Sequence, residues 1–184
     1  MNRNQNKIDA DALYETSDII ASTYELSDLL DKILGLAARA IQASKGLVLL
    51  YNTVTNKLDV NSIYGKYKKL PDYFDSDKGL GGYILKHKQP VIINDLKNSA
   101  LYKKTALQGY ETTTMLAVSL CLKKEAAGFI LLGDKTKKAG GEFTLNDQNL
   151  LEAITKQTAA AMANALCRRE AVSKERLERK YFRL

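Results

Sequence analysis

The residues able to do chemistry are few, and they lie far apart in the sequence. His87, the only histidine, stands between two lysines, and the two cysteines, Cys121 and Cys167, form no C-x-x-C motif. A metal site needs several ligands at a characteristic spacing, and nucleophilic catalysis needs a base beside the nucleophile. Because neither pattern is present, the sequence predicts no catalytic residue, no metal site and no cofactor.

A glycine cluster is the most distinctive short motif. Gly79-Leu80-Gly81-Gly82 leads into the apolar run Tyr83-Ile84-Leu85, and together they predict a short helix over 79–88. The cluster is not the G-x-G-x-x-G fingerprint of dinucleotide-binding proteins. Ile84 stands where that pattern has its third glycine, and no parallel β-α-β unit surrounds the cluster. We expect the glycines to supply positive φ and close packing at the helix start. The alternative is that the amides of this start face an anionic ligand group.

Length and charge narrow the class of protein. With 184 residues, 45% of them hydrophobic, the chain fits one domain with appended helices. The tail from residue 168 to 184 carries seven basic residues and three glutamates, which is +4 of the net +7. No element interleaves basic and aromatic residues, and no apolar run reaches the roughly 18–20 residues that a membrane span needs. We therefore expect no nucleic-acid partner, no membrane association and a cytoplasmic location. Salt-dependent binding of nucleic acid by the basic tail is the competing interpretation.

Hydrophobic periodicity gives the order of the elements. The predicted helices cover 8–22, 26–41, 79–88, 98–108 and a long C-terminal stretch after Thr144, and the predicted strands cover 46–51, 58–63, 91–94, 114–122 and 128–133. Residues 65–77 and 135–141 are predicted loops. Short turns join the strand pairs, so the sheet should be mainly antiparallel. This predicts an α+β fold with the N- and C-terminal helices packed on one face of the sheet and short helices and loops over a pocket on the other.

The C-terminal helix is predicted to be unusually long. Its apolar stripe starts at Leu150 and resumes at Leu177, Tyr181 and Leu184. Such a helix is typical of a coiled coil or bundle, so we expect a homodimer through the terminal helices. A stripe that reaches the last residue leads us to expect a following output domain. The chain then divides into an N-terminal dimer or linker helix at 1–25, one domain at 26–166 and a C-terminal signalling linker at 167–184.

The ordered set of motifs resembles a GAF domain over roughly residues 26–166. The set comprises Gly79–Tyr83, Pro90–Asp95, the strand Met115–Leu120, the strand Gly128–Leu132, and Phe143 with Asp147 before the last helix. The resemblance implies a GAF-like fold, related to the profilin and PAS folds. It also implies a regulatory role in signal transduction that senses a small ligand.

The resemblance extends to an ion pair of the cyclic-nucleotide-binding members. Their N-K…F…D-E pattern is similar to Asp134-Lys135…Phe143…Asp147-Gln148 here. Lys135, Phe143 and Asp147 match, which implies a buried structural pair between Lys135 and Asp147. Asp134 and Gln148 depart from the pattern, so a cyclic nucleotide is one candidate ligand beside other small metabolites.

The resemblance places the ligand pocket between the sheet and the loops after Gly79. The candidate ligand-binding residues are Asp95, Tyr102, Tyr110, Thr112 and Thr114. Hydroxyl groups suit phosphate or carbonyl groups, and a tyrosine can stack on a base. The plainer interpretation of Thr112–Thr114 is a β-branched entry into a strand.

We therefore expect a non-catalytic sensor module that controls a C-terminal output domain. The ending Glu178–Arg183 is similar to linkers that precede adenylate and guanylate cyclase domains, and it could equally precede a kinase, a diguanylate cyclase or a transcription-activation domain. One alternative is a GAF domain that dimerises or binds proteins without a ligand. Another is a redox enzyme of the free-methionine sulfoxide reductase type, which would need reactive thiols at Cys121 and Cys167.

Overall fold

The fold is a single antiparallel sheet between a helical layer and a layer of loops. The computed structural model describes residues 2–23, 25–99 and 110–181, with side chains from residue 6 to residue 166 within these ranges. The sheet has the order β3-β2-β1-β6-β5-β4, and every neighbouring pair is antiparallel. The strands are β1 (Ala43–Asn52), β2 (Lys57–Tyr64), β3 (Tyr73–Asp75), β4 (Val91–Ile93), β5 (Met115–Leu122) and β6 (Glu125–Lys135). The predicted mainly antiparallel α+β fold is confirmed.

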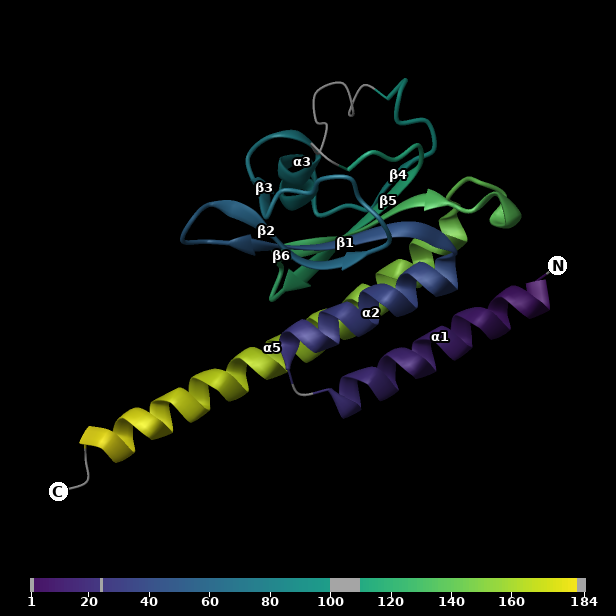
Figure 1. Ribbon diagram of the computed structural model, residues 1–184. Helices are drawn as coiled ribbons and strands as arrows, with labels where there is room; N and C mark the ends of the chain where they lie inside the picture. Colours follow the sequence, from purple (N-terminus) through teal and green to yellow (C-terminus); the bar gives the residue numbers. More distant parts are fainter. Residues whose placement is uncertain (1, 24, 100–109, 182–184) are drawn as a thin grey trace.

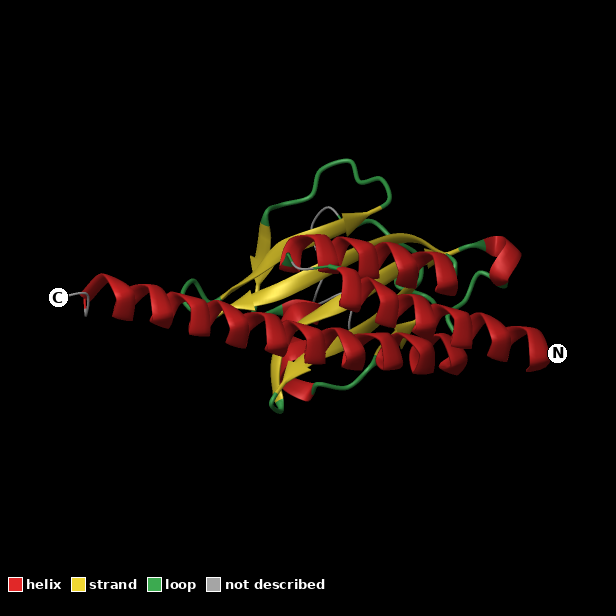
Figure 2. Ribbon diagram, turned by 90° about the horizontal axis from the view of Figure 1, so that it is seen from below, coloured by secondary structure: helices red, strands yellow, loops and turns green. Residues whose placement is uncertain are grey.

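Three long helices cover one face of the sheet. They are α1 (Asn2–Ser22), α2 (Leu26–Ile41) and α5 (Leu145–Tyr181). Figures 1 and 2 show α2 and α5 against the strands, with α1 beneath them. The short helix α3 (Gly79–His87) and the long connections lie on the opposite face, which we call the loop face. This arrangement matches the predicted layers.

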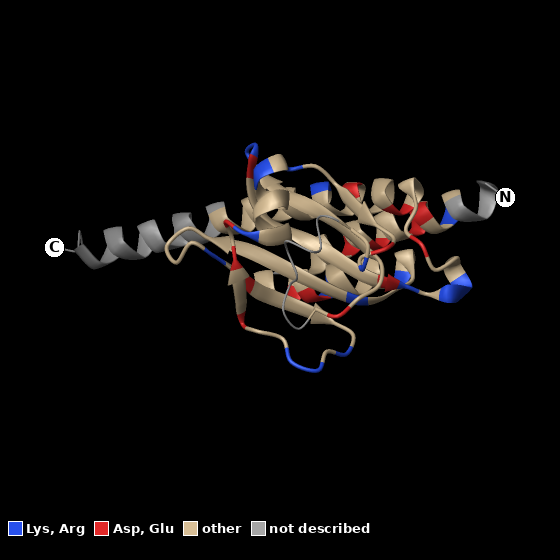
Figure 3. Ribbon diagram, turned by 90° about the horizontal axis from the view of Figure 1, so that it is seen from above, with Lys and Arg blue, Asp and Glu red and all other residues tan. Residues whose placement is uncertain are grey.

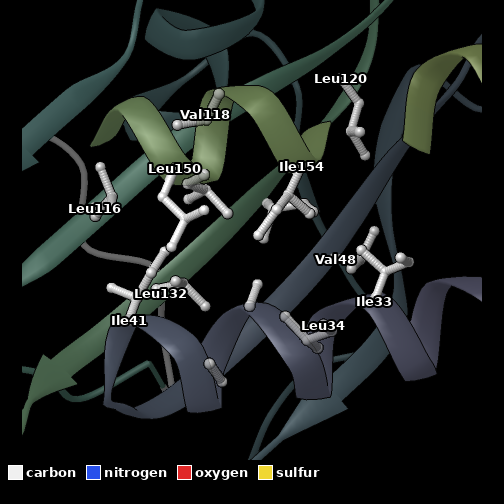
Figure 4. Packing of buried hydrophobic residues seen from close by; sticks show 14 of the residues in the cluster. Ile33, Leu34, Ile41, Val48, Leu116, Val118, Leu120, Leu132, Leu150 and Ile154 are labelled. Carbon is white, nitrogen blue, oxygen red and sulfur yellow. The ribbon is translucent and has the colours of Figure 1, made fainter. Parts of the chain in front are cut away.

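The helix-face core explains why α2 and α5 lie where they do. Apolar residues recur along α2 at helical spacing, so one side of the helix must be buried. Figure 4 shows this side and the start of α5 packed on side chains of β1, β5 and β6. The labelled residues are Ile33, Leu34, Ile41, Val48, Leu116, Val118, Leu120, Leu132, Leu150 and Ile154, all buried. Each fully buried aliphatic side chain contributes about 1.5–3 kcal/mol, so this layer fixes both helices.

The terminal helices differ from the expectation in their lengths. The helix predicted from residue 8 begins at Asn2, because the polar residues 2–7 continue the backbone of α1 without a breaker. Ala12 and Thr16 are its buried contacts with the bundle. Helix α5 has 37 residues, in agreement with the unusually long helix predicted there, and it projects past the sheet (Figure 1). The side chains that continue the predicted stripe after residue 166 lie outside the described part.

The connection between β2 and α3 contains a strand that the sequence does not predict. Residues 65–77 are predicted to be a loop, but Tyr73–Asp75 forms β3 and pairs with Lys57–Asp59 of β2. A three-residue strand leaves no readable alternation, and only buried Phe74 marks it. The short helix expected over 98–108 lies almost entirely outside the described residues.

The glycine cluster packs α3 onto the sheet. Gly79 has φ +68°, a left-handed conformation that glycine adopts without strain. A Cβ at Gly81 would lie 2.5 Å from Leu58 Cδ1, and one at Gly82 would lie 2.7 Å from the Asp77 carbonyl carbon. The expected role in positive φ and close packing is therefore what the structure shows.

Replacement of Gly82 by alanine tests this packing. The new methyl group meets backbone atoms of Asp77, which cannot move aside as a side chain can. We expect Gly82→Ala to lower the free energy of unfolding by about 1–3 kcal/mol in urea titrations. Gly35→Ala is the matched control, because its Cβ meets only the end of the Arg39 side chain and alanine favours a helix. Equal effects of the two substitutions would contradict this explanation.

Candidate ligand-binding site

A group of polar side chains gathers on the loop face at one end of the central strands. Lys45 of β1 and Met115 of β5 both pair with Gly133 of β6, so the ends of three adjacent strands meet there. The group, which we call the polar cluster, consists of Lys45, Tyr67, Tyr110, Thr112, Thr113 and Asp134. Basic residues elsewhere lie mainly in loops around the sheet (Figure 3).

Asp134 is the centre of the polar cluster. Its Oδ1 accepts hydrogen bonds from the Thr112 hydroxyl at 2.8 Å, the Thr113 amide at 2.7 Å and the Thr113 hydroxyl at 3.0 Å. Its Oδ2 lies 3.1 Å from the Lys45 ammonium. Lys45 also donates to the carbonyl of Glu111. One carboxylate thus ties the segment before β5 to the ends of β1 and β6.

These contacts keep Asp134 ionised. Burial alone would raise the pKa of this half-buried carboxyl, but donors from Thr113, Thr112 and Lys45 outweigh it, so the pKa lies below the ordinary value. The negative charge of Asp134 is therefore present throughout the physiological range, and it neutralises Lys45.

Two tyrosines form the aromatic side of the polar cluster. The rings of Tyr67 and Tyr110 lie 5.6 Å apart at 30°. The Tyr67 hydroxyl donates to the Gly46 carbonyl at 3.0 Å, whereas the buried Tyr110 hydroxyl has no hydrogen-bond partner among the described residues. A Cβ at Gly133 would lie 2.5 Å from that hydroxyl oxygen, so glycine makes room for it. Burial raises the pKa of both tyrosines well above the ordinary value, so they stay protonated and act as donors and stacking surfaces, not bases.

Lys135, next to Asp134, points to the opposite side of the sheet. Its Nζ lies 2.5 Å from Asp147 Oδ1, and both side chains are less than 10% exposed. Asp147 Oδ2 accepts from the Thr144 amide at 2.8 Å and the Thr144 hydroxyl at 2.9 Å, while the Asp147 amide donates to that hydroxyl. This is a capping box with aspartate in the third position, so the ion pair anchors β6 to the first turn of α5.

A local change of backbone conformation separates the two charges. Leu132 and Lys135 both face the helices although they are three positions apart, a spacing that a regular strand would place on opposite faces. Asp134 between them has φ +53°, in the left-handed region that aspartate and asparagine tolerate best. This left-handed conformation lets the consecutive charged residues Asp134 and Lys135 bind elements on opposite faces of the sheet.

Asn94 adds a second link to the start of α5. Its Nδ2 donates to the Phe143 carbonyl at 2.9 Å, and its Oδ1 accepts from the Phe143 amide at 2.8 Å. Asn94 directly follows β4, and Phe143 is buried beside the Lys135 ammonium. The start of α5 is therefore held by the ends of two strands.

The predicted ligand-binding residues fall into different positions. Tyr110 and Thr112 belong to the polar cluster. Thr114 is buried, and its hydroxyl oxygen accepts a hydrogen bond from the Lys135 amide at 3.1 Å. Asp95 is exposed, and hydrogen bonds from Asn98 lower the pKa of its carboxyl. Tyr102 lies outside the described residues.

Sequence reasoning missed Lys45, Tyr67, Asn94 and the role of Asp134. Two signals were available: a lysine next to a strand of pure apolar residues, and a glycine in β6 just before a charged pair. Neither signal identifies the partner, because Lys45 and Asp134 are 89 positions apart and meet only through the pairing of β1 with β6.

Other candidate chemical groups lie apart from the polar cluster. His87 is exposed and stacks on Tyr83 with ring centroids 4.3 Å apart. Cys121 is a free thiol near the other end of β5, and Cys167 has no described side chain. Among the residues with described side chains, no three His, Cys, Asp or Glu residues come together to hold a metal ion. No described helix is both long and apolar enough to span a bilayer.

Removal of the Lys135 ammonium should be among the costliest substitutions near the surface of this domain. Lys135→Met leaves the Asp147 carboxylate buried without its cation. We expect a loss of about 3 kcal/mol in the free energy of unfolding, measured in urea. Lys137→Met, two residues away and exposed, is the control and should change stability by less than about 0.5 kcal/mol. A loss at Lys135 no larger than that control would mean the pair does not anchor α5.

The charge of Asp134 predicts a pH-dependent contribution to stability. Because the folded-state pKa is lowered, the stabilisation is complete above the unfolded-state value near 4 and is lost as the pH falls through the folded-state value. Asp134→Asn should therefore cost about 1 kcal/mol at pH 7, and the difference from wild type should shrink below about pH 4. An unchanged difference at pH 3 would show that the charge does not matter.

The comparisons with known proteins agree with this geometry. The GAF domain family matches residues 25–164, which is most of the chain. No curated protein sequence matches the chain significantly. Among solved structures, the GAF domain of an Acinetobacter phosphoenolpyruvate-protein phosphotransferase superposes with a TM-score of 0.70 at 16% identity, covering 91% of this chain and 97% of that one.

Two further structures show the same fold in different proteins. A free methionine-R-sulfoxide reductase from Neisseria meningitidis, solved with its substrate, has a TM-score of 0.74 at 13% identity and covers 89% of this chain and 91% of its own. A methyl-accepting chemotaxis protein fragment has a TM-score of 0.69 at 12% identity, with 82% and 96% covered. GAF domains are, in general, small-ligand sensory and regulatory modules. By its family match and its fold, the chain belongs to the GAF domain family.

Proposed function

We propose that this chain is a non-catalytic regulatory module that senses a small ligand on its loop face and transmits the change through α5. The observation that carries the proposal is the pair of consecutive residues at the end of β6. Asp134 binds Thr112 and Thr113 on the loop face, and Lys135 binds the first turn of α5. A ligand that displaces Thr112 or Thr113 from Asp134 would therefore act on the end of β6, which also holds α5 through Lys135.

The side chains of the polar cluster suit binding better than catalysis. Its tyrosines are held protonated, and its lysine is neutralised by Asp134. A general base needs a pKa near the working pH, and burial holds the pKa of both tyrosines well above it. The redox alternative needs both Cys121 and Cys167. Cys121 lies toward the end of β5 away from Thr112, and the side chain of Cys167 lies outside the described part. A binding function therefore has more support than an enzymatic one.

The proposed ligand is a cyclic nucleotide or another small metabolite. Stacking on the partly exposed ring of Tyr67 and hydrogen bonds to threonine hydroxyls suit a purine or another planar group. Asp134 already neutralises Lys45, so an anionic phosphate gains little at the polar cluster itself. Neutral and zwitterionic metabolites therefore belong in the same test as cyclic nucleotides.

The proposed output route is a dimer of the terminal helices. Helix α5 projects beyond the sheet (Figure 1), and in this proposal its projecting part pairs with a second copy and acts on an attached output domain. A nucleotide cyclase is one candidate for that domain. Rotation or separation of the two paired α5 helices would then pass a ligand-induced change at the loop face to the output domain.

A ligand screen tests the sensing function. Cyclic AMP, cyclic GMP, purines and amino acids are added singly while thermal unfolding is followed. A ligand at one hundred times its Kd should add about 2.7 kcal/mol of stability. Thr112→Val should weaken that effect, because it removes a donor to Asp134, whereas Thr53→Val in the exposed β1–β2 turn should leave it unchanged.

The same screen can contradict the proposal in two ways. If no probe stabilises the protein, the ligand-free interaction domain becomes the better interpretation. If a probe binds but hydrogen exchange in the first turn of α5 stays the same, the loop face senses without transmitting.

A further inference from the structure

A groove runs along α5 on the helix side of the domain. Strand β4 pairs with β5 only from Met115 to Ala117, so the described edge of β5 beyond Ala117 has no strand beside it. This edge and α5 enclose a groove of about 380 Å³. Its apolar lining includes Val118, Leu122, Ala159 and Ala163. The small alanine side chains leave room for another element to approach closely.

The rim of the groove is basic. Lys88, Lys123 and Lys156 line it together with one carboxylate, Glu152, and Lys88 is itself paired with Glu125 at 3.1 Å. Lys156 lies 3.9 Å from Glu152 within α5, which is a weak exposed pair. A partner with acidic side chains around an apolar anchor would complement both the floor and the rim.

The chain itself carries such a surface on α1. Asp11, Tyr14 and Asp18 are exposed at positions i, i+3 and i+7, so they share one side of the helix. Tyr14 is 76% exposed, which is unusual for so large an aromatic residue. The sequence of α1 holds four acidic and two basic residues in a protein of net charge +7.

We propose that this outer side of α1 docks into the groove of a second copy, with the Tyr14 ring against the alanines of α5 and the carboxylates against the lysine rim. Buried tyrosines surrounded by a polar rim are typical anchors of protein interfaces. Two copies would exchange the contact reciprocally, as a two-fold dimer requires. The inference rests on the dimer in the proposed function and names the surfaces that form it.

Charge reversal tests the assignment in the full chain. One variant carries Lys123→Glu and Lys156→Glu, and the other carries Asp11→Lys and Asp18→Lys. By sedimentation, each alone should dimerise at least tenfold more weakly than wild type, and an equimolar mixture should recover the wild-type affinity. Val54→Ser, at a 92% exposed position in the β1–β2 turn, is the control and should dimerise normally.

A cross-link tests the contact directly. Cys121 lines the groove, so Tyr14→Cys in a Cys167→Ser background should link to it between copies under mild oxidation, giving a covalent dimer. Val54→Cys in the same background should give at least tenfold less. A wild-type protein that stays monomeric at high micromolar concentration overturns both the dimer and this interface. A dimer that persists in both charge variants and does not cross-link overturns the groove assignment alone.

Discussion

The structure depends on the end of β6, where two charged residues in succession bind opposite sides of the sheet. A buried charge is stable only with a close partner, so Lys135 must keep Asp147, and the first turn of α5 cannot leave the sheet without exposing or orphaning one of them. Asp134 imposes a similar constraint on the loop face through four close donors. The left-handed backbone at Asp134 makes both arrangements compatible in one strand.

The surrounding fold turns this local constraint into a connection between layers. β6 lies in the middle of the sheet, with β1 and β5 on either side, so its end is fixed by long ladders of hydrogen bonds. The helix-face core holds α2 and the start of α5 against the same three strands. Asn94, which follows β4, binds Phe143, so the start of α5 is held by the ends of both β4 and β6. The sheet therefore joins the loop face to the start of α5 through the end of β6.

The sequence predicts the elements well where a hydrophobic pattern extends over many residues. It predicts poorly those contacts that join residues far apart in the chain. The stripe of α2 and the continuous apolar runs of the β5–β6 hairpin are readable because each extends over many residues. β3 is missed because three residues carry no period, and the early start of α1 because polar residues 2–7 carry no apolar signal. The polar cluster could not be assembled from sequence, since Lys45 meets Asp134 only after β1 has paired with β6. The resemblance to the family pointed to Lys135 and Asp147, whereas Asp134 stood out only as a departure from the pattern.

A double-mutant cycle between the two faces tests the central claim most directly. Lys45→Met disturbs the polar cluster, Asp147→Asn disturbs the anchor of α5, and the two residues bind different partners on β6. If the end of β6 couples the faces, the losses in the free energy of unfolding should depart from additivity by at least about 0.5 kcal/mol. Losses that add to within about 0.3 kcal/mol would show that the loop face and α5 are independent, and would contradict the proposed route of transmission.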